Sequence, residues 1–102
     1  MLHVIATIEL KPGLRGAFLA AFCELAPKVQ AEAGCLEYCI TEDVATGLAA
    51  QGLARPDVLT IVERWASLDH LRAHLAAPHM AEYGKQVKDL RTGVHLQVLQ
   101  PL

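Results

Sequence analysis

Three of the five histidines lie within ten residues of one another, at His70, His74 and His79. A neutral imidazole has an ordinary pKa of about 6.5, so each of them could give or accept a proton near neutral pH. His70 and His74 are four positions apart, which places them on one face of a helix and would also suit two metal ligands. No nearby cysteine or well-spaced carboxylate completes a metal site. The pattern therefore favours acid–base chemistry without a metal.

Aromatic residues on either side of this stretch could bind a ring-shaped substrate. Trp65 could form a pocket wall with its indole N–H directed at a substrate oxygen, or it could fill the core as an ordinary tryptophan. Tyr83 could orient a substrate through its hydroxyl or pack in the core. His74 and His79 carry the same structural alternative, whereas His70 is expected to face solvent. The candidate catalytic residues are His74, His79, Trp65 and Tyr83.

Glu63 is a carboxylate within an apolar segment. If it is buried it needs a partner such as a histidine or arginine, and a structural salt bridge is the simpler interpretation. A raised pKa would instead make it a candidate base. The substrate-binding residues that we expect around it lie on the apolar faces of the predicted elements: Tyr38, Glu63, Ile61 and Phe22.

Strands are indicated wherever apolar and polar residues alternate. In each of these segments one face is almost entirely apolar, as in Leu2, Val4 and Ala6. In the second strand we expect Leu36 to share the inner face with Tyr38. The predicted strands are residues 2–10, 35–43, 57–65 and 94–100.

Helices are indicated by apolar residues that recur every three or four positions. The first spans residues 14–33, with Pro27 expected to kink or divide it and Gly34 just past its end. Ser67 is a suitable cap for a second helix, and Pro78 starts a third. Residues 44–56, between the second and third strands, are expected to form a long turn or flexible hairpin tip.

The order β-α-β-β-α-β, with the second α split in two, specifies a ferredoxin-like α+β fold. We expect one domain, residues 1–102, with a four-stranded antiparallel sheet and helices on one face. The second faces of the strands still carry apolar residues such as Ile5, Val58 and Val62. An uncovered face of this kind would be an exposed apolar patch, so we expect a homodimer formed through the sheet faces.

Composition excludes some classes of function. The chain is 53% hydrophobic with a net charge of −2, and its nine lysines and arginines are scattered, which argues against nucleic-acid binding. No apolar run approaches the roughly 18 residues that a membrane helix needs, and no secretory signal is visible, so we expect no membrane contact and a cytoplasmic location. The three cysteines are expected to be small buried hydrophobes, with a reactive thiol as the alternative.

Three motifs in this order resemble the antibiotic biosynthesis monooxygenase family, which includes the bacterial quinol monooxygenases. The resemblance extends over residues 2–98. The motifs are Lys11-Pro12-Gly13, then Glu32-Ala33-Gly34-Cys35-Leu36-Glu37-Tyr38, then Glu63-Arg64-Trp65-Ala66-Ser67 followed by Leu71, His74 and Pro78-His79-Met80.

This resemblance implies a dimeric α/β barrel in which the sheets face each other, with a pocket between sheet and helices. It also implies oxidation of phenols or quinols by O₂ with no metal, flavin or other cofactor. The haem-degrading branch has an asparagine where this chain has Thr7, which counts against haem. The segment 43–57 is longer than the family's short turn and could reshape the pocket mouth or the dimer contact.

Two other functions remain open at this stage. A dimeric module that binds a small molecule without catalysis needs the apolar pocket but no base. An isomerase-type enzyme acting on a small metabolite needs a base but no O₂. The first hypothesis, a cofactor-independent monooxygenase for a small aromatic, phenolic or quinol compound, requires both the pocket and the base.

Overall fold

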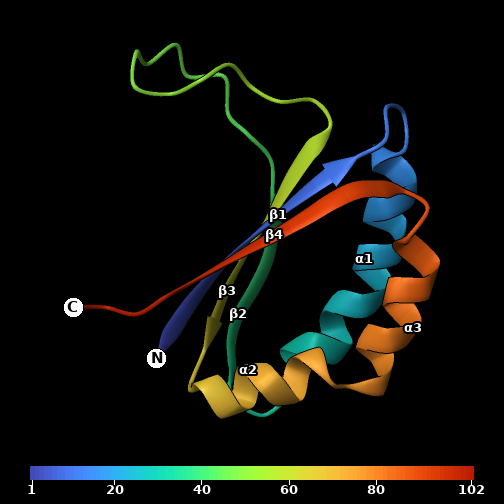
Figure 1. The fold of residues 1–102 in the computed structure, drawn as a ribbon, viewed down its shortest axis with the longest axis vertical. Helices are drawn as coiled ribbons and strands as arrows, with labels where there is room; N and C mark the ends of the chain where they lie inside the picture. The colour runs from blue at the N-terminus through green and yellow to red at the C-terminus, as the bar shows by residue number, and fades with distance from the viewer.

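The computed structural model of residues 1–102 has four strands and three helices (Figure 1). The second helical region is divided in two, as the sequence predicts. The elements are β1 (Leu2–Leu10), α1 (Arg15–Gln30), β2 (Cys35–Thr41), β3 (Val58–Trp65), α2 (Leu68–Leu75), α3 (Pro78–Val87) and β4 (Arg91–Leu99).

The strands form one antiparallel sheet in the order β2-β3-β1-β4. The helices lie on one side of it, with α1 and α3 next to each other and α2 crossing one end of the sheet (Figure 1). This arrangement confirms the predicted ferredoxin-like α+β fold. The two central strands, β1 and β3, pair from Leu2 with Trp65 to Glu9 with Val58, so their inward-facing rows lie side by side.

The core is built from these inward-facing rows and the inner faces of the helices. All even-numbered residues of β1 from Val4 onward are buried, as are all odd-numbered residues of β3 from Leu59 onward. The helix α1 contributes Phe18, Phe22 and other residues at the predicted spacing of three and four. Burial of apolar area on this scale is the main force that holds the helices to the sheet.

Strand β2 departs from simple alternation. The pairing of β2 with β3 shifts register between Cys35 and Glu37, so Leu36 is an extra residue and is half exposed. The prediction that Leu36 points inward was therefore wrong, because a bulge of this kind changes the side to which the next residues point. Cys35 takes the inner place opposite Trp65, while Tyr38 remains buried as predicted.

The helix α1 runs through Pro27 and ends at Gln30, three residues before the predicted end. The turn that follows uses Gly34, whose φ is +79°, a conformation that other residues rarely adopt. A Cβ atom at this position would lie 2.3 Å from Cγ of His70. The prediction that His70 faces solvent was wrong, because its ring packs over this glycine and its Nδ1 lies 2.7 Å from Oγ of Ser67.

The caps of the shorter helices agree with the sequence. Oγ of Ser67 accepts a hydrogen bond from the backbone N–H of His70, and Pro78 is the first residue of α3. The last strand, β4, begins at Arg91, three residues earlier than predicted. The side chains of β4 that point to the helix side of the sheet are more exposed than those of the other strands, because the helices do not extend over β4. Three apolar residues on this side of β4 are between 39% and 47% exposed: Val94, Leu96 and Val98.

Cys23 and Cys39 are exposed and Cys35 is half-buried, so the expectation of buried cysteines was wrong. All three thiols are free. The long connection between β2 and β3 is irregular, but Arg55 ties its base to Asp43 through an N–H bond of 2.8 Å and lowers the pKa of that carboxyl group to about 2. No helix is long and apolar enough to cross a membrane.

Candidate active site

Glu32 joins the two candidate histidines. Its Oε2 lies 3.0 Å from Nδ1 of His74 and 2.7 Å from Nε2 of His79. Both ring nitrogens must carry a hydrogen to donate to this one oxygen, which fixes the tautomers of the neutral rings. The carboxylate therefore orients His74 with its second nitrogen, Nε2, as an available proton acceptor.

The turn after α1 and the short helices α2 and α3 bring these three side chains together. Glu32 follows the last turn of α1, His74 lies on the inner face of α2, and His79 is the second residue of α3. His74 is only 2% exposed, while Glu32 and His79 are partly open to solvent. A proton on the buried imidazole thus has a route to solvent through Glu32.

Trp65 packs directly on His74. The centroids of the two rings are 4.6 Å apart and the rings are tilted by 32°. The indole N–H donates to Oε1 of Glu63 at 2.9 Å, so it is not free to reach a substrate oxygen. The partner of Glu63 is therefore this tryptophan, not the histidine or arginine that the sequence suggested. Burial raises the pKa of Glu63 above its ordinary value, although the Trp65 bond and the nearby His74 oppose this change.

Two aromatic contacts connect this cluster to α1. The ring of Tyr38 meets the edge of His74 at 5.6 Å between centroids, and on its other side it stacks on Phe22 at 5.3 Å. Burial, and after it the negative charge of Glu63, raises the pKa of Tyr38. Ile61 lies between Glu63 and Leu59 along the inner face of β3 and is part of the same core.

Tyr83 has a buried hydroxyl group without any hydrogen-bond partner. Its ring lies on α3 and meets the edge of Phe18 at 6.0 Å. Burial raises its pKa, while the charge of Arg91 acts in the opposite direction. A buried hydroxyl without a partner costs about 1–3 kcal/mol, so a ligand that supplied an acceptor would remove this cost.

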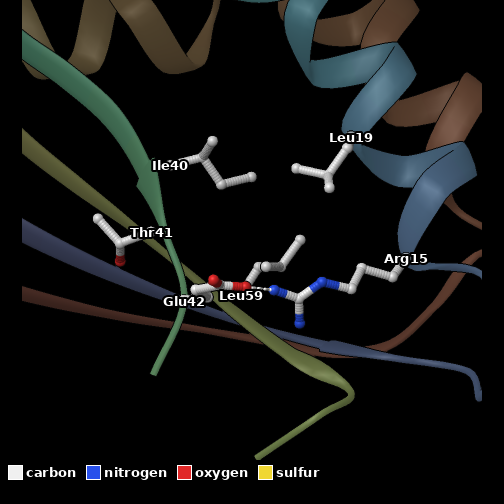
Figure 2. Close-up of a pocket in the computed structure, with 6 residues that line it drawn as sticks. All are labelled: Arg15, Leu19, Ile40, Thr41, Glu42 and Leu59. Atoms are coloured by element: carbon white, nitrogen blue, oxygen red, sulfur yellow. Dashed lines mark hydrogen bonds and ion pairs between the residues drawn. The ribbon is translucent and has the colours of Figure 1, made fainter. Parts of the chain in front are cut away.

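A cavity of about 330 Å³ lies further along the sheet, between the first turns of α1, the end of β2 and the start of β3. Its apolar walls are Leu19, Ile40 and Leu59, and Arg15 pairs with Glu42 at its mouth (Figure 2). Ile40 is two residues from Tyr38 on the inner face of β2. The Tyr38–Phe22 stack therefore lies between this cavity and the histidine cluster.

The structure brings together most of the predicted site residues. His74, Trp65, Glu63 and Tyr38 form one contact cluster, with His79 joined through Glu32 and with Phe22 stacked on Tyr38. Tyr83 belongs to the same core cluster and lines a small hollow together with His79. The cavity beside Arg15 is lined by none of the four candidate catalytic residues. No group of three or more histidine, cysteine or acidic side chains is arranged to hold a metal ion.

The sequence reasoning missed Glu32 and Arg15 as site residues. Glu32 was noticed only as part of a motif, because a carboxylate after a long helix usually faces water. Glu32 is only two residues before Gly34, and this short spacing could have indicated its position. A tight turn at the glycine brings the residues before it back over the end of the sheet. Arg15 had no signal, because its place at the cavity depends on how α1 lies across β2.

A family model described as antibiotic biosynthesis monooxygenase matches residues 1–86. The chain is 41% identical over 103 residues to "Probable quinol monooxygenase YgiN" of Escherichia coli (strain K12), covering 99% of this chain and 98% of that protein. Among solved structures, Rv0793 from Mycobacterium tuberculosis has a TM-score of 0.81 at 30% identity, covering 99% and 94% of the two chains. PA3566 from Pseudomonas aeruginosa has a TM-score of 0.80 at 26% identity, covering 99% and 93%. These similarities include every element that carries the site.

Proposed function

This chain belongs to the antibiotic biosynthesis monooxygenase family, and from that premise we propose that it oxidises a small phenolic or quinol compound with O₂. The electrons come from the substrate itself, without a cofactor. The observation that carries the proposal is the buried His74, held by Glu32 on one side and by the Trp65 ring on the other. It is the one cluster in the chain that combines a fixed imidazole with an aromatic surface.

His74 is the proposed base. A phenol gives an electron to O₂ far more readily after it has lost its proton, so a positioned acceptor is the first requirement. Glu32 fixes the ring so that Nε2 receives the phenolic proton, and it stabilises the imidazolium that forms. His79 is a positioning residue in this proposal, because its Nε2 is already used to hold Glu32.

Aromatic and hydroxyl groups complete the proposed site. Tyr38 and Phe22 provide flat surfaces against which a substrate ring packs after their stack opens. The free hydroxyl of Tyr83 is the proposed donor to a substrate oxygen. Trp65 supports His74 from behind, since its own N–H is bonded to Glu63.

The reaction balances without an external reductant. One atom of O₂ replaces a ring hydrogen as a hydroxyl group, and the other leaves as water with the two phenolic protons. The quinol supplies four electrons, two when its ring becomes a quinone and two when the C–H bond becomes C–O. His74 takes the first phenolic proton and returns it to the departing water.

Oxygen uptake with menadiol tests this function. General acid–base catalysis contributes roughly 100-fold or more, so His74→Gln should lower kcat by at least that factor. Glu32→Gln, which changes a more exposed residue, should lower kcat less and shift the pH dependence. Both variants need circular dichroism to show that they fold. Uptake by the wild type no faster than by folded His74→Gln, over several quinols, would leave a non-catalytic binding module as the better account.

The proposed active unit is a homodimer formed through the outer face of the sheet. In a single subunit that face leaves Ile5, Val58 and Val62 only half-buried, with no helix on that side. An uncovered apolar sheet face favours pairing with a second copy. Light scattering should give twice the chain mass at micromolar concentration, and Val62→Asp should shift it toward the monomer. A wild-type chain that is monomeric at this concentration would contradict the proposal.

A further inference from the structure

The cavity at the start of α1 is built to receive one charged group on an otherwise apolar ligand. Figure 2 shows Leu19 and Ile40 directed toward each other across it, with Leu59 beneath. Arg15 is the only cationic residue among its six lining residues. At about 330 Å³ the cavity is at the lower end of the size range of small-molecule sites.

We propose that Arg15 binds a carboxylate on the substrate, whose aromatic ring then lies between Leu19 and Ile40 and points toward Tyr38. This inference rests on the proposed oxidation for its substrate class and adds the group that selects the substrate. The site is distinct in position from the histidine cluster, and it assigns a role to residues that the acid–base chemistry does not use.

The guanidinium of Arg15 is held in place for this task. Its Nη1 donates to the backbone oxygen of Pro56 at 3.0 Å, and its Nη2 pairs with the Glu42 carboxylate. The Pro56 contact keeps the planar group at the cavity mouth whether or not Glu42 remains bound. A fixed guanidinium suits a carboxylate well, because it offers parallel N–H donors and stays charged.

Glu42 acts as a replaceable partner. Its side chain is 67% exposed and lies just past the end of β2, so it can turn into water when a ligand carboxylate takes its place. An exposed ion pair of this kind contributes little stability, so the exchange costs little. The neighbouring Arg55 is different, since two N–H bonds and its backbone N–H hold it to Asp43.

The first turn of α1 adds to the preference for an anion. No side chain caps this helix, and no acidic residue lies in its first turn. Arg15 is the first residue of this sixteen-residue helix, so the positive end of the helix lies at the cavity that Arg15 lines, with no acidic residue in the same turn. From Thr41 back to Tyr38 the strand covers about 10 Å, so two or three fused rings would extend from Arg15 to the Tyr38–Phe22 stack.

Binding of two matched ligands without oxygen tests the proposal separately from catalysis. The ligands are 6-hydroxy-2-naphthoate and 2-naphthol, which differ only in the carboxylate, and the hydroxyl group of the naphthoate lies at the end of the rings opposite to it. Calorimetry should show that the wild type binds the naphthoate at least tenfold more tightly. Arg15→Gln should remove this difference and leave the affinity for 2-naphthol unchanged, whereas Glu42→Gln should increase the affinity for the naphthoate severalfold. Arg72→Gln, an exposed arginine on α2, is the control.

NMR spectra of the methyl groups show where the ligand binds. The methyl resonances of Leu19 and Ile40 should shift when the naphthoate is added. Equal affinity of the wild type for both ligands, or naphthoate binding to Arg15→Gln as tight as to the wild type, would overturn the proposal. Exposure of the complexes to air separates the two claims. If the carboxylate preference holds but neither the naphthoate nor menadiol is oxidised, the anion site is supported and the oxidation is refuted.

Discussion

The helix-covered face of the sheet has two unlike ends. At the closed end, where β3 finishes and α2 begins, Trp65 and His74 are almost completely buried, and the ring of His74 packs against those of Trp65 and Tyr38. At the open end, where α1 begins, Leu19 and Ile40 face a cavity and a surface ion pair. The closed end holds the candidate base and its partners, and the open end holds the space.

The difference shows how a small fold can meet two requirements of catalysis, a fixed base and space for a ligand, in two separate places. A base that must keep one tautomer and one orientation needs close packing, which leaves no room for a ligand. A ligand needs room and a solvent-facing entrance, which would loosen a base placed there. The Tyr38–Phe22 stack is the boundary between the two regions. These two rings must separate before a substrate in the cavity can reach His74.

The largest contrast between the two ends should be in stability. Trp65→Ala removes a fully buried ring and should lower the free energy of unfolding by about 3–5 kcal/mol. Leu19→Ala removes a partly buried side chain beside existing space and should cost about 1 kcal/mol. Urea denaturation measures both. Similar losses for the two variants would mean that the ends are packed equally well.

Tyr83 should show opposite effects on folding and on substrate binding. Tyr83→Phe deletes a buried hydroxyl without a partner, so the free energy of unfolding should rise by about 1 kcal/mol. The same change removes the proposed donor, so KM for menadiol should increase severalfold. Denaturation and oxygen uptake on the one variant provide the two readouts. A less stable variant would show that the hydroxyl has a partner in the folded protein.

The smallest expected effect is a pH dependence that belongs to the closed end. The pKa of Glu63 is raised by burial above its ordinary value of 4.5, so the folded state keeps this proton when the unfolded chain has lost it. Stability is therefore lost as the pH rises from 4.5 toward the raised pKa, and it then stays constant. Glu63→Gln has no proton to lose at this position. The free energy of unfolding of the variant minus that of the wild type should therefore increase between pH 4 and pH 7.

The exposed Glu82 on α3 offers the matched control for this measurement. Comparison with Glu82→Gln separates the effect of burial at Glu63 from the general effect of replacing a glutamate by glutamine. Denaturation at four or five pH values in one buffer series is sufficient. A Glu63→Gln difference that does not change with pH would mean that the Glu63 carboxyl group titrates as it does in the unfolded chain.

Much of the fold could be predicted from local sequence. Alternation identifies the inner faces of β1 and β3, and it places Glu63 and Trp65 on the same face two residues apart. That spacing also allows their hydrogen bond, although the direction of the indole N–H depends on what surrounds it. The bulge at Leu36 could not be predicted, because it changes the register of one strand without changing its alternating composition.

The candidate site was only partly predictable for a related reason. His74 and Trp65 were found because histidine and tryptophan are chemically distinctive. The role of Glu32 depends on a turn, and that of Arg15 depends on how a helix lies across the sheet, so neither is a property of neighbouring residues. The open inner row of β4, which includes Leu96, likewise reflects where the helices end and not the strand's own pattern.

Isotope labelling under ¹⁸O₂ tests whether the chain inserts an oxygen atom into a quinol with His74 as the base. The wild type would be mixed with menadiol, and the product and water analysed by mass spectrometry, with folded His74→Gln in parallel. We expect a hydroxylated quinone that carries one ¹⁸O atom, formed by the wild type and nearly absent with the variant. Unlabelled quinone accompanied by hydrogen peroxide, or equal labelling by His74→Gln, would contradict this mechanism.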